Sequence, residues 1–137
     1  MENLIIQGTD STPGIILDKQ KHYIEFTGDS RPENVKMFFE PVLNWISEYM
    51  NHIYFFSNES SKKINIIVDF KFEYFNSSSA KYIIDIINAL TKIKSTNKNV
   101  DLCLNWCYEE DDDDIKDAGQ EFVKITGIPM SFILIKL

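Results

Sequence analysis

The chain has 137 residues, of which 44% are hydrophobic and 13% aromatic, enough to build the core of one domain and too many for a disordered chain. The formal net charge of -7 argues against a nucleic-acid backbone or an anionic membrane as the main partner. No apolar run reaches the roughly 18 residues that span a bilayer, and the N-terminus shows no signal-peptide pattern. We therefore expect a cytoplasmic protein that neither inserts into a membrane nor binds nucleic acid.

The first thirty residues predict short strands. Residues 4–6 are a candidate for a short edge strand, and residues 9–14 are rich in turn-forming residues. Residues 15–17 and 23–27 have the composition of two further strands. The polar segment 18–21 between them suits a hairpin loop.

A long helix is expected next. Ser30 and Glu33 have the spacing of a capping box, and Pro32 is tolerated in a first helical turn. Pro41 interrupts the helical pattern, so we expect a kink or a break there. Residues 57–63 have the composition of a polar loop. The apolar residues of this helix recur at helical spacing; they are Val35, Phe38, Phe39, Val42, Ile46, Tyr49 and Ile53.

The stretch from Ile64 to Leu90 predicts a strand, a polar turn and a helix. Apolar side chains occupy the even positions from Ile64 to Tyr74, and the odd positions are mostly polar, which is the alternation of a strand with one buried face. The turn is Asn76-Ser77-Ser78-Ser79. After Ala80 the apolar residues change to helical spacing, which predicts a helix over residues 77–95.

The last third predicts a strand, a helix and a strand. Residues 100–108 alternate again, and a strand, a helix and a strand at this spacing imply a right-handed crossover and a parallel pair. The next helix follows the acidic run 109–114 and ends with Gly127 as its C-cap, before a last strand over residues 130–137. The order β-β-α-β-α-β-α-β defines a single α/β domain over residues 1–137, with a mixed sheet of about five strands and about three helices.

The serine turn has two interpretations. Asn76 or a serine can serve as the N-cap of the helix, where it satisfies free backbone amides and contributes about 1 kcal/mol. The same position also suits a phosphorylated side chain, because free N–H groups and the helix dipole stabilise a phosphate there. One cap needs one such side chain, so four polar residues in a row leave some unexplained.

The acidic run 109–114 also admits more than one role. Its aspartates suit an N-cap and favourable first-turn charges, with the glutamates solvated. A divalent-metal site is an alternative, although the run lacks the spaced ligands and the glycine of a calcium loop. A surface that docks a partner is a third. The two histidines have no catalytic companion, and no nucleophile elbow, phosphate-binding loop, dinucleotide fingerprint or zinc-protease motif is present, so we expect neither an enzyme nor a cofactor.

The two cysteines are predicted to remain thiols, buried or half-buried. Cys103 and Cys107 lie on the same face of one predicted strand, with Cα atoms roughly 13 Å apart, too far for a disulfide. His22 and His52 show no zinc-finger spacing to them, so we expect no metal site.

Several short motifs, in order and at matching spacing over most of the chain, resemble those of the SiaC-type regulatory phosphoproteins of bacteria. That family is similar in fold to the STAS domains of anti-sigma-factor antagonists, so the resemblance implies a STAS-like domain. The matching pieces are Thr12-Pro13, the segment from Gly28 to Asn34, Phe38-Phe39-Glu40-Pro41 with Trp45, the segment from Tyr74 to Ser79 with Lys81, Trp106 and Tyr108, and Ala118-Gly119 with Glu121-Phe122.

The resemblance implies a protein switch without enzymatic activity. In the family, a Ser or Thr of the serine turn is phosphorylated by a Ser/Thr protein kinase and dephosphorylated by a PP2C-type phosphatase. The unphosphorylated form binds a diguanylate cyclase and promotes cyclic-di-GMP synthesis. By position, the phosphoacceptor here is Ser77, with Ser78 and Ser79 as alternates, and Asn76 and Lys81 complete the phosphosite and partner-binding turn. The alternatives are a small metal-binding protein or enzyme that uses residues 109–114, and a structural interaction subunit.

Overall fold

The computed structural model describes residues 1–59 and 62–135, which form six strands and three helices. The elements are β1 (Leu4–Ile6), β2 (Gly14–Asp18), β3 (Tyr23–Ser30), α1 (Val35–Glu59), β4 (Ile64–Phe75), α2 (Ser77–Thr96), β5 (Val100–Glu109), α3 (Asp113–Thr126) and β6 (Ser131–Ile135). The predicted α/β class, element order and mixed sheet are confirmed, and the short edge strand β1 raises the strand count from about five to six among these residues.

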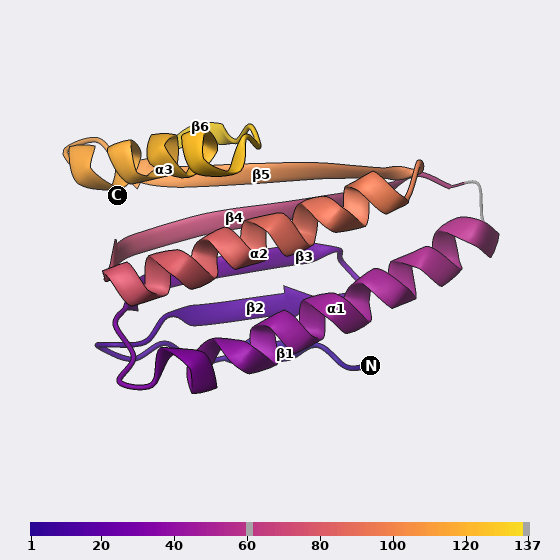
Figure 1. Ribbon diagram of the computed structural model, residues 1–137, viewed down its shortest axis with the longest axis horizontal. Helices are drawn as coiled ribbons and strands as arrows, with labels where there is room; N and C mark the ends of the chain where they lie inside the picture. Colours follow the sequence, from indigo (N-terminus) through magenta and orange to yellow (C-terminus); the bar gives the residue numbers. More distant parts are fainter. Residues whose placement is uncertain (60–61, 136–137) are drawn as a thin grey trace.

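The six strands lie side by side in the order of the chain. β1, β2 and β3 pair antiparallel, whereas β3, β4, β5 and β6 pair parallel. Each parallel pair is therefore joined by one helix. Figure 1 shows α1 and α2 crossing in front of the sheet, and α2 packs against both α1 and α3. The domain thus has two layers, a sheet and a layer of helices.

The core lies between these two layers. The even positions of β4 face the helices, and Ile66, Val68 and Phe70 are fully buried there. α2 presents Ile83, Ile87 and other isoleucines at helical spacing to this surface. The alternation in β4 and the helical stripe in α2 both supply side chains to the same buried core, which explains why both patterns are strong in the sequence.

The opposite face of the sheet carries a linked polar cluster on its central strands. The Tyr23 hydroxyl donates to Asp69 Oδ2 at 2.8 Å and to Glu25 Oε1 at 3.0 Å. Lys71 Nζ donates to Glu25 Oε1 at 3.1 Å, and Asn105 Nδ2 donates to Asp69 Oδ1 at 2.9 Å. Three adjacent strands, β3, β4 and β5, are thereby connected by side chains as well as by their ladders.

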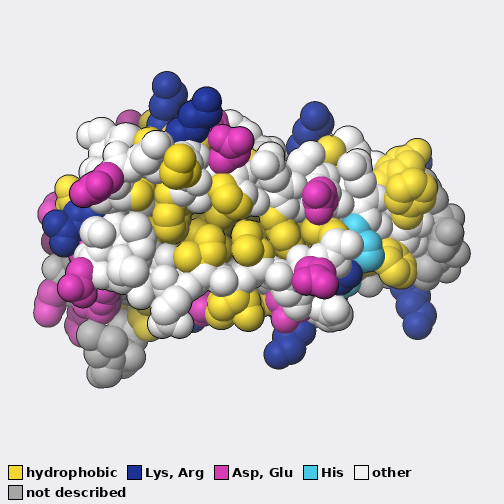
Figure 2. Space-filling model, turned by 90° about the horizontal axis from the view of Figure 1, so that it is seen from below, with side chains coloured by type: hydrophobic (Ala, Val, Ile, Leu, Met, Phe, Trp, Pro, Cys, Tyr) yellow, Lys and Arg dark blue, Asp and Glu magenta, His cyan; other side chains and the backbone are white. Residues whose placement is uncertain are grey.

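A second surface feature lies over α1 and the β1 edge. Seen from this side, hydrophobic side chains gather in a band along the middle of the face (Figure 2). β1 and α1 contribute several exposed apolar residues, including Ile5 and Met37, each 72% exposed. Apolar surface of this kind is a common property of interaction sites.

The predicted capping box at Ser30 is wrong. β3 continues to Ser30, which pairs with Phe75, because a bulge between Gly28 and Asp29 extends the ladder and Gly28 adopts a φ of 84°. The N-cap role falls to Asn34, whose side chain accepts from the Met37 amide at 3.1 Å.

α1 is one helix through Pro41, so the predicted break is absent from the described residues. It also runs to Glu59, so the first part of the predicted polar loop 57–63 is helical. Residues 60–61 of that loop and residues 136–137 of the predicted last strand lie outside the described residues.

α3 packs very closely on β5. Trp106 is fully buried, and its indole Nε1 donates to the Ile115 carbonyl at 2.7 Å. A Cβ at Gly119 would lie 2.3 Å from Trp106 Cδ1, so the indole occupies the space of a side chain at this position. The predicted end of α3 is confirmed: Gly127 adopts the left-handed conformation, and its amide donates to the Val123 carbonyl at 2.9 Å.

A candidate phosphoswitch site at the start of α2

The serine turn lies where three connections meet at the carboxyl ends of the parallel strands. The Asn76 amide donates to the Ser30 carbonyl at 3.1 Å, which joins the β4–α2 turn to the end of β3. The Arg31 amide donates to the Ser11 carbonyl at 2.8 Å, which adds the β1–β2 connection. Arg31 also lies 3.8 Å from the Asp29 carboxylate. Backbone hydrogen bonds therefore anchor the turn to the end of β3, and Ser77 and Ser78 remain exposed.

Asn76 is the N-cap of α2. Its backbone is extended (φ -87°, ψ 174°), and its side-chain oxygen accepts from the Ser79 amide at 2.9 Å. The Ser78 hydroxyl donates to the same oxygen at 3.1 Å. One of the two sequence-based interpretations, the helix cap, is thus fulfilled by Asn76, and the following serines are not needed for it.

Ser79 is an internal residue. It is fully buried, donates to the Ser30 carbonyl at 3.0 Å and accepts from the Ser30 hydroxyl at 2.8 Å. Ser30 is also fully buried. This pairing was missed from the sequence, because the two serines are 49 positions apart and each had a plausible local role as a cap. Among the three serines, Ser79 is the one that a kinase cannot reach in this conformation.

Ser77 and Ser78 are both exposed. Among the described residues, none forms a hydrogen bond with the Ser77 hydroxyl, which leaves this oxygen available to an enzyme. The first turn of α2 contains no acidic residue, so a phosphate there would be the first anion at the positive end of the helix dipole. Lys81 is exposed four residues further on, the spacing at which helical side chains are neighbours.

The acidic run has a local structural role. Asp112 is the N-cap of α3, and its carboxylate accepts from the Ile115 amide at 3.0 Å. Asp113 and Asp114 occupy the first turn, where they complement the helix dipole. Within residues 1–59 and 62–135, no group of three or more His, Cys, Asp or Glu is arranged to hold a metal ion.

The thiols and the histidines are placed as follows. Cys107 is buried, whereas Cys103 is exposed, which corrects the prediction that both would be at least half-buried. Burial lowers the pKa of His22 and of His52. The two rings line one cavity at the far end of the sheet, a proximity that their separation in sequence does not reveal.

Comparisons with known proteins agree with this architecture. A family model described as SiaC family regulatory phosphoprotein matches residues 6–135. A protein of Pseudomonas aeruginosa (strain UCBPP-PA14) is 28% identical over 131 residues, which cover 96% of this chain and 95% of that protein. SiaC of Pseudomonas aeruginosa has a solved structure with a TM-score of 0.74 and 27% identity, covering 99% of this chain and 98% of that one.

A further solved structure is that of the diguanylate cyclase SiaD in complex with its activator SiaC, also from Pseudomonas aeruginosa. It is similar to this chain with a TM-score of 0.77 and 26% identity, covering 96% of this chain and 99% of the matched one.

The fold and the family match thus define a regulatory α/β protein. The chain belongs to the SiaC family of regulatory phosphoproteins. None of the helices that the structure describes is both long and apolar enough to cross a membrane.

Proposed function

We propose that this protein is a non-enzymatic switch whose unphosphorylated form binds and activates a diguanylate cyclase. A Ser/Thr kinase would phosphorylate Ser77 and a PP2C-type phosphatase would remove the phosphate, all in the cytoplasm. Family membership supports the regulatory role, and the complex of SiaC with the cyclase SiaD supports the class of partner. The choice of residue rests on the exposed Ser77, whose hydroxyl has no hydrogen-bond partner among the described residues, whereas the Ser78 hydroxyl donates to Asn76 and Ser79 is buried.

The switch would act through charge at an interface and leave the fold intact. The α2 cap depends on Asn76 and the link to β3 depends on Ser79, and both groups keep their partners when Ser77 is modified. A phosphate on Ser77 would add close to two negative charges beside Lys81. A partner surface that packs on the uncharged turn would then have to desolvate a dianion, which weakens association.

The test combines binding and cyclase activation. Ser77→Asp should weaken binding to the cyclase by at least about tenfold, or roughly 1.4 kcal/mol, and reduce cyclic-di-GMP formation from GTP accordingly. Ser77→Ala should bind like the unmodified protein. Ser95→Asp is the matched control, because Ser95 is an exposed serine at the other end of the same helix. Equal binding by Ser77→Ala and Ser77→Asp would refute the role of this residue.

The modification itself is tested directly. The protein is incubated with the candidate kinase and ATP, and the phosphate is located by mass mapping of peptides. We expect it on Ser77, and the Ser77→Ala variant should remain unmodified. A phosphate on another residue, with Ser77→Ala still labelled, would contradict the assignment. Thermal unfolding of the phosphorylated protein should lie close to that of the unmodified one, because no buried contact is lost.

A further inference from the structure

The chain contains a single arginine, Arg31. Among its 14 lysines and arginines, the other 13 are lysines. The two residues are not equivalent, because the planar guanidinium of arginine offers parallel N–H groups that match two oxygens of a phosphate, whereas the lysine ammonium acts as a point charge. In a chain that otherwise relies on lysine, the position of the one arginine indicates where this geometry is available.

Arg31 lies directly beside the serine turn. It follows Ser30, whose carbonyl accepts from the Asn76 amide at 3.1 Å, and Asn76 in turn precedes Ser77. Arg31 and Ser77 are therefore each one residue away from the same hydrogen bond. Ser30 and Phe75 are also partners in the parallel β3–β4 ladder, so the two segments leave the sheet side by side.

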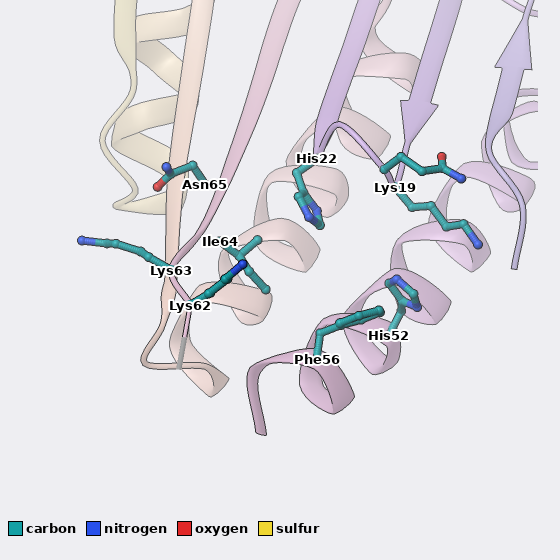
Figure 3. A pocket seen from close by; sticks show the side chains of 9 residues that line it. Lys19, His22, His52, Phe56, Lys62, Lys63, Ile64 and Asn65 are labelled. Carbon is teal, nitrogen blue, oxygen red and sulfur yellow. The ribbon is translucent and has the colours of Figure 1, made fainter. Parts of the chain in front are cut away.

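Several of the lysines lie at the opposite end of the sheet. Lys19, Lys62 and Lys63 are gathered around the cavity next to the start of β4 (Figure 3). β4 has 12 residues, so this cavity and Ser77 are separated by roughly 35 Å, the length of the strand. The screening length at physiological ionic strength is about 8 Å, so these charges do not act on the serine turn.

The Arg31 guanidinium is held weakly in the unmodified protein. Its Nη2 donates to the Asp10 carbonyl at 3.3 Å, a long hydrogen bond to an uncharged group. The same atom is 3.8 Å from the Asp29 carboxylate, and the Arg31 side chain is 53% exposed, so water screens this ion pair. The Arg31 amide donates to the Ser11 carbonyl at 2.8 Å, which fixes the backbone. The side chain alone would therefore have to turn to meet a new anion.

We propose that Arg31 is the internal receptor for the phosphate on Ser77, an inference that rests on the proposed phosphorylation of this serine. Once the phosphate is attached, the guanidinium leaves Asp10 and Asp29 and donates two parallel hydrogen bonds to phosphate oxygens. This contact connects the start of α2 to the segment 31–34 that leads into α1. Phosphorylation then changes both the charge and the shape of the surface that a partner meets.

Other charges near the turn also act on such a phosphate. Lys81, exposed one turn into α2, would favour the phosphate dianion and lower its second pKa. The carboxylates of Asp10, Asp29 and Glu33, in the connections at the same end of the sheet, would raise that pKa by repulsion. Single substitutions are therefore needed to separate the contribution of Arg31 from those of its neighbours.

The test installs phosphoserine at position 77 during protein synthesis, so that no kinase is needed. A phosphorus NMR titration then gives the second pKa of the phosphate, which is about 6 for a phosphoserine without a partner. We expect a lower value in this protein, and Arg31→Gln should raise it by about 0.5 or more, because a bound cation favours the dianion. Arg31→Lys keeps the charge without the bidentate geometry and should restore part of the effect.

The matched control is Lys36→Gln. Lys36 is exposed at the start of α1, so this change removes one positive charge at the same end of the molecule. It should move the phosphate pKa by less than about 0.2, because an exposed charge away from the turn is screened. Thermal melts establish that each variant is folded.

A second measurement uses the unsubstituted arginine. Because the chain has one arginine, its Nε–Hε group gives one signal in a nitrogen–proton correlation spectrum. A contact with the phosphate on residue 77 should shift this signal downfield and slow its exchange with water. Phosphoserine installed in place of Ser95, at the other end of α2, should leave the signal where it is.

Two outcomes would overturn this proposal. One is a phosphate pKa that Arg31→Gln leaves unchanged, or that Lys81→Gln raises more than Arg31→Gln does. The other is an Nε–Hε signal that phosphoserine at position 77 does not move. Either result would leave the kinase mapping and the cyclase binding of Ser77 variants as they stand. A failure of those two experiments would in turn leave the NMR result on Arg31 intact.

Discussion

The hydroxyls of Ser30 and Ser79 form a buried pair that joins the end of β3 to the start of α2. The Ser30 hydroxyl donates to the Ser79 hydroxyl at 2.8 Å, and the Ser79 hydroxyl donates to the Ser30 carbonyl at 3.0 Å. This contact fixes the position of the helix end that presents Ser77. The contact also distinguishes Ser79, which is buried and has a structural role, from Ser77 and Ser78, which are exposed.

Removing either hydroxyl should therefore reduce stability. We expect Ser79→Ala and Ser30→Ala each to lower the free energy of unfolding by about 1–3 kcal/mol, because a buried hydrogen bond is lost. The double variant should lose less than the sum, since the two residues share one contact. Urea unfolding followed by circular dichroism measures all three. Ser77→Ala is the control and should stay within about 0.5 kcal/mol of the unmodified protein. Fully additive losses would contradict the pairing.

Gly119→Ala should destabilise the protein although it replaces a glycine inside a helix. In an open helix this change is favourable by about 1 kcal/mol. Here the new Cβ would lie 2.3 Å from Trp106 Cδ1 and 2.5 Å from Nε1, so the buried indole must move. We expect a net loss of about 1–3 kcal/mol in urea unfolding. Gln120→Ala, an exposed neighbour on α3, should leave stability nearly unchanged. A Gly119→Ala variant as stable as the unmodified protein would show that the α3–β5 contact is loose.

From the lowered pKa values of His22 and His52, the two histidines that line the cavity, we predict that the stability of the fold falls in mild acid. Their pKa values are lowered from the ordinary value of 6.5 in the folded protein, mainly by burial. Near pH 6.5 the unfolded chain therefore binds more protons than the folded one, so the free energy of unfolding decreases as the pH falls through 6.5. Urea unfolding at pH 7.5, 6.5 and 5.5 measures this slope. The His22→Gln/His52→Gln double variant should show a flatter profile, and an unchanged slope would assign the effect to other groups.

The two cysteines should react at very different rates. Burial, with Asp69 nearby, raises the pKa of the Cys107 thiol to about 11, so little thiolate is present at pH 8. Cys103 is exposed. Alkylation of the native protein with iodoacetamide, followed by peptide mapping, should modify Cys103 first and leave Cys107 largely unmodified. In urea both should react alike. Equal rates in the native protein would contradict the buried position of Cys107.

Local patterns predicted the centre of the fold well. β4 and α2 each bury one face in the common core, so the sequence carries both signals strongly. The C-cap at Gly127 was also predictable, because a left-handed residue strongly favours glycine. In the site, the exposed position of Ser77 agrees with its expected role, and its phosphorylation stays a prediction.

The features that were missed depend on contacts between distant residues. Ser30 and Glu33 have the local form of a cap, but the bulge at Gly28 carries β3 past that position. α1 continues through Pro41, although the proline lacks the amide that would donate to the Met37 carbonyl. The cavity that unites His22 and His52 likewise forms only when the hairpin and α1 come together.

The polar cluster of Tyr23, Glu25, Asp69, Lys71 and Asn105 has a consequence for how the molecule behaves at high concentration. A sheet with helices on only one side offers its bare side for stacking against another sheet, as in a sandwich. Here such stacking would strip water from a carboxylate and ammonium network that spans three strands. That penalty keeps the bare side hydrated and directs association toward other parts of the surface.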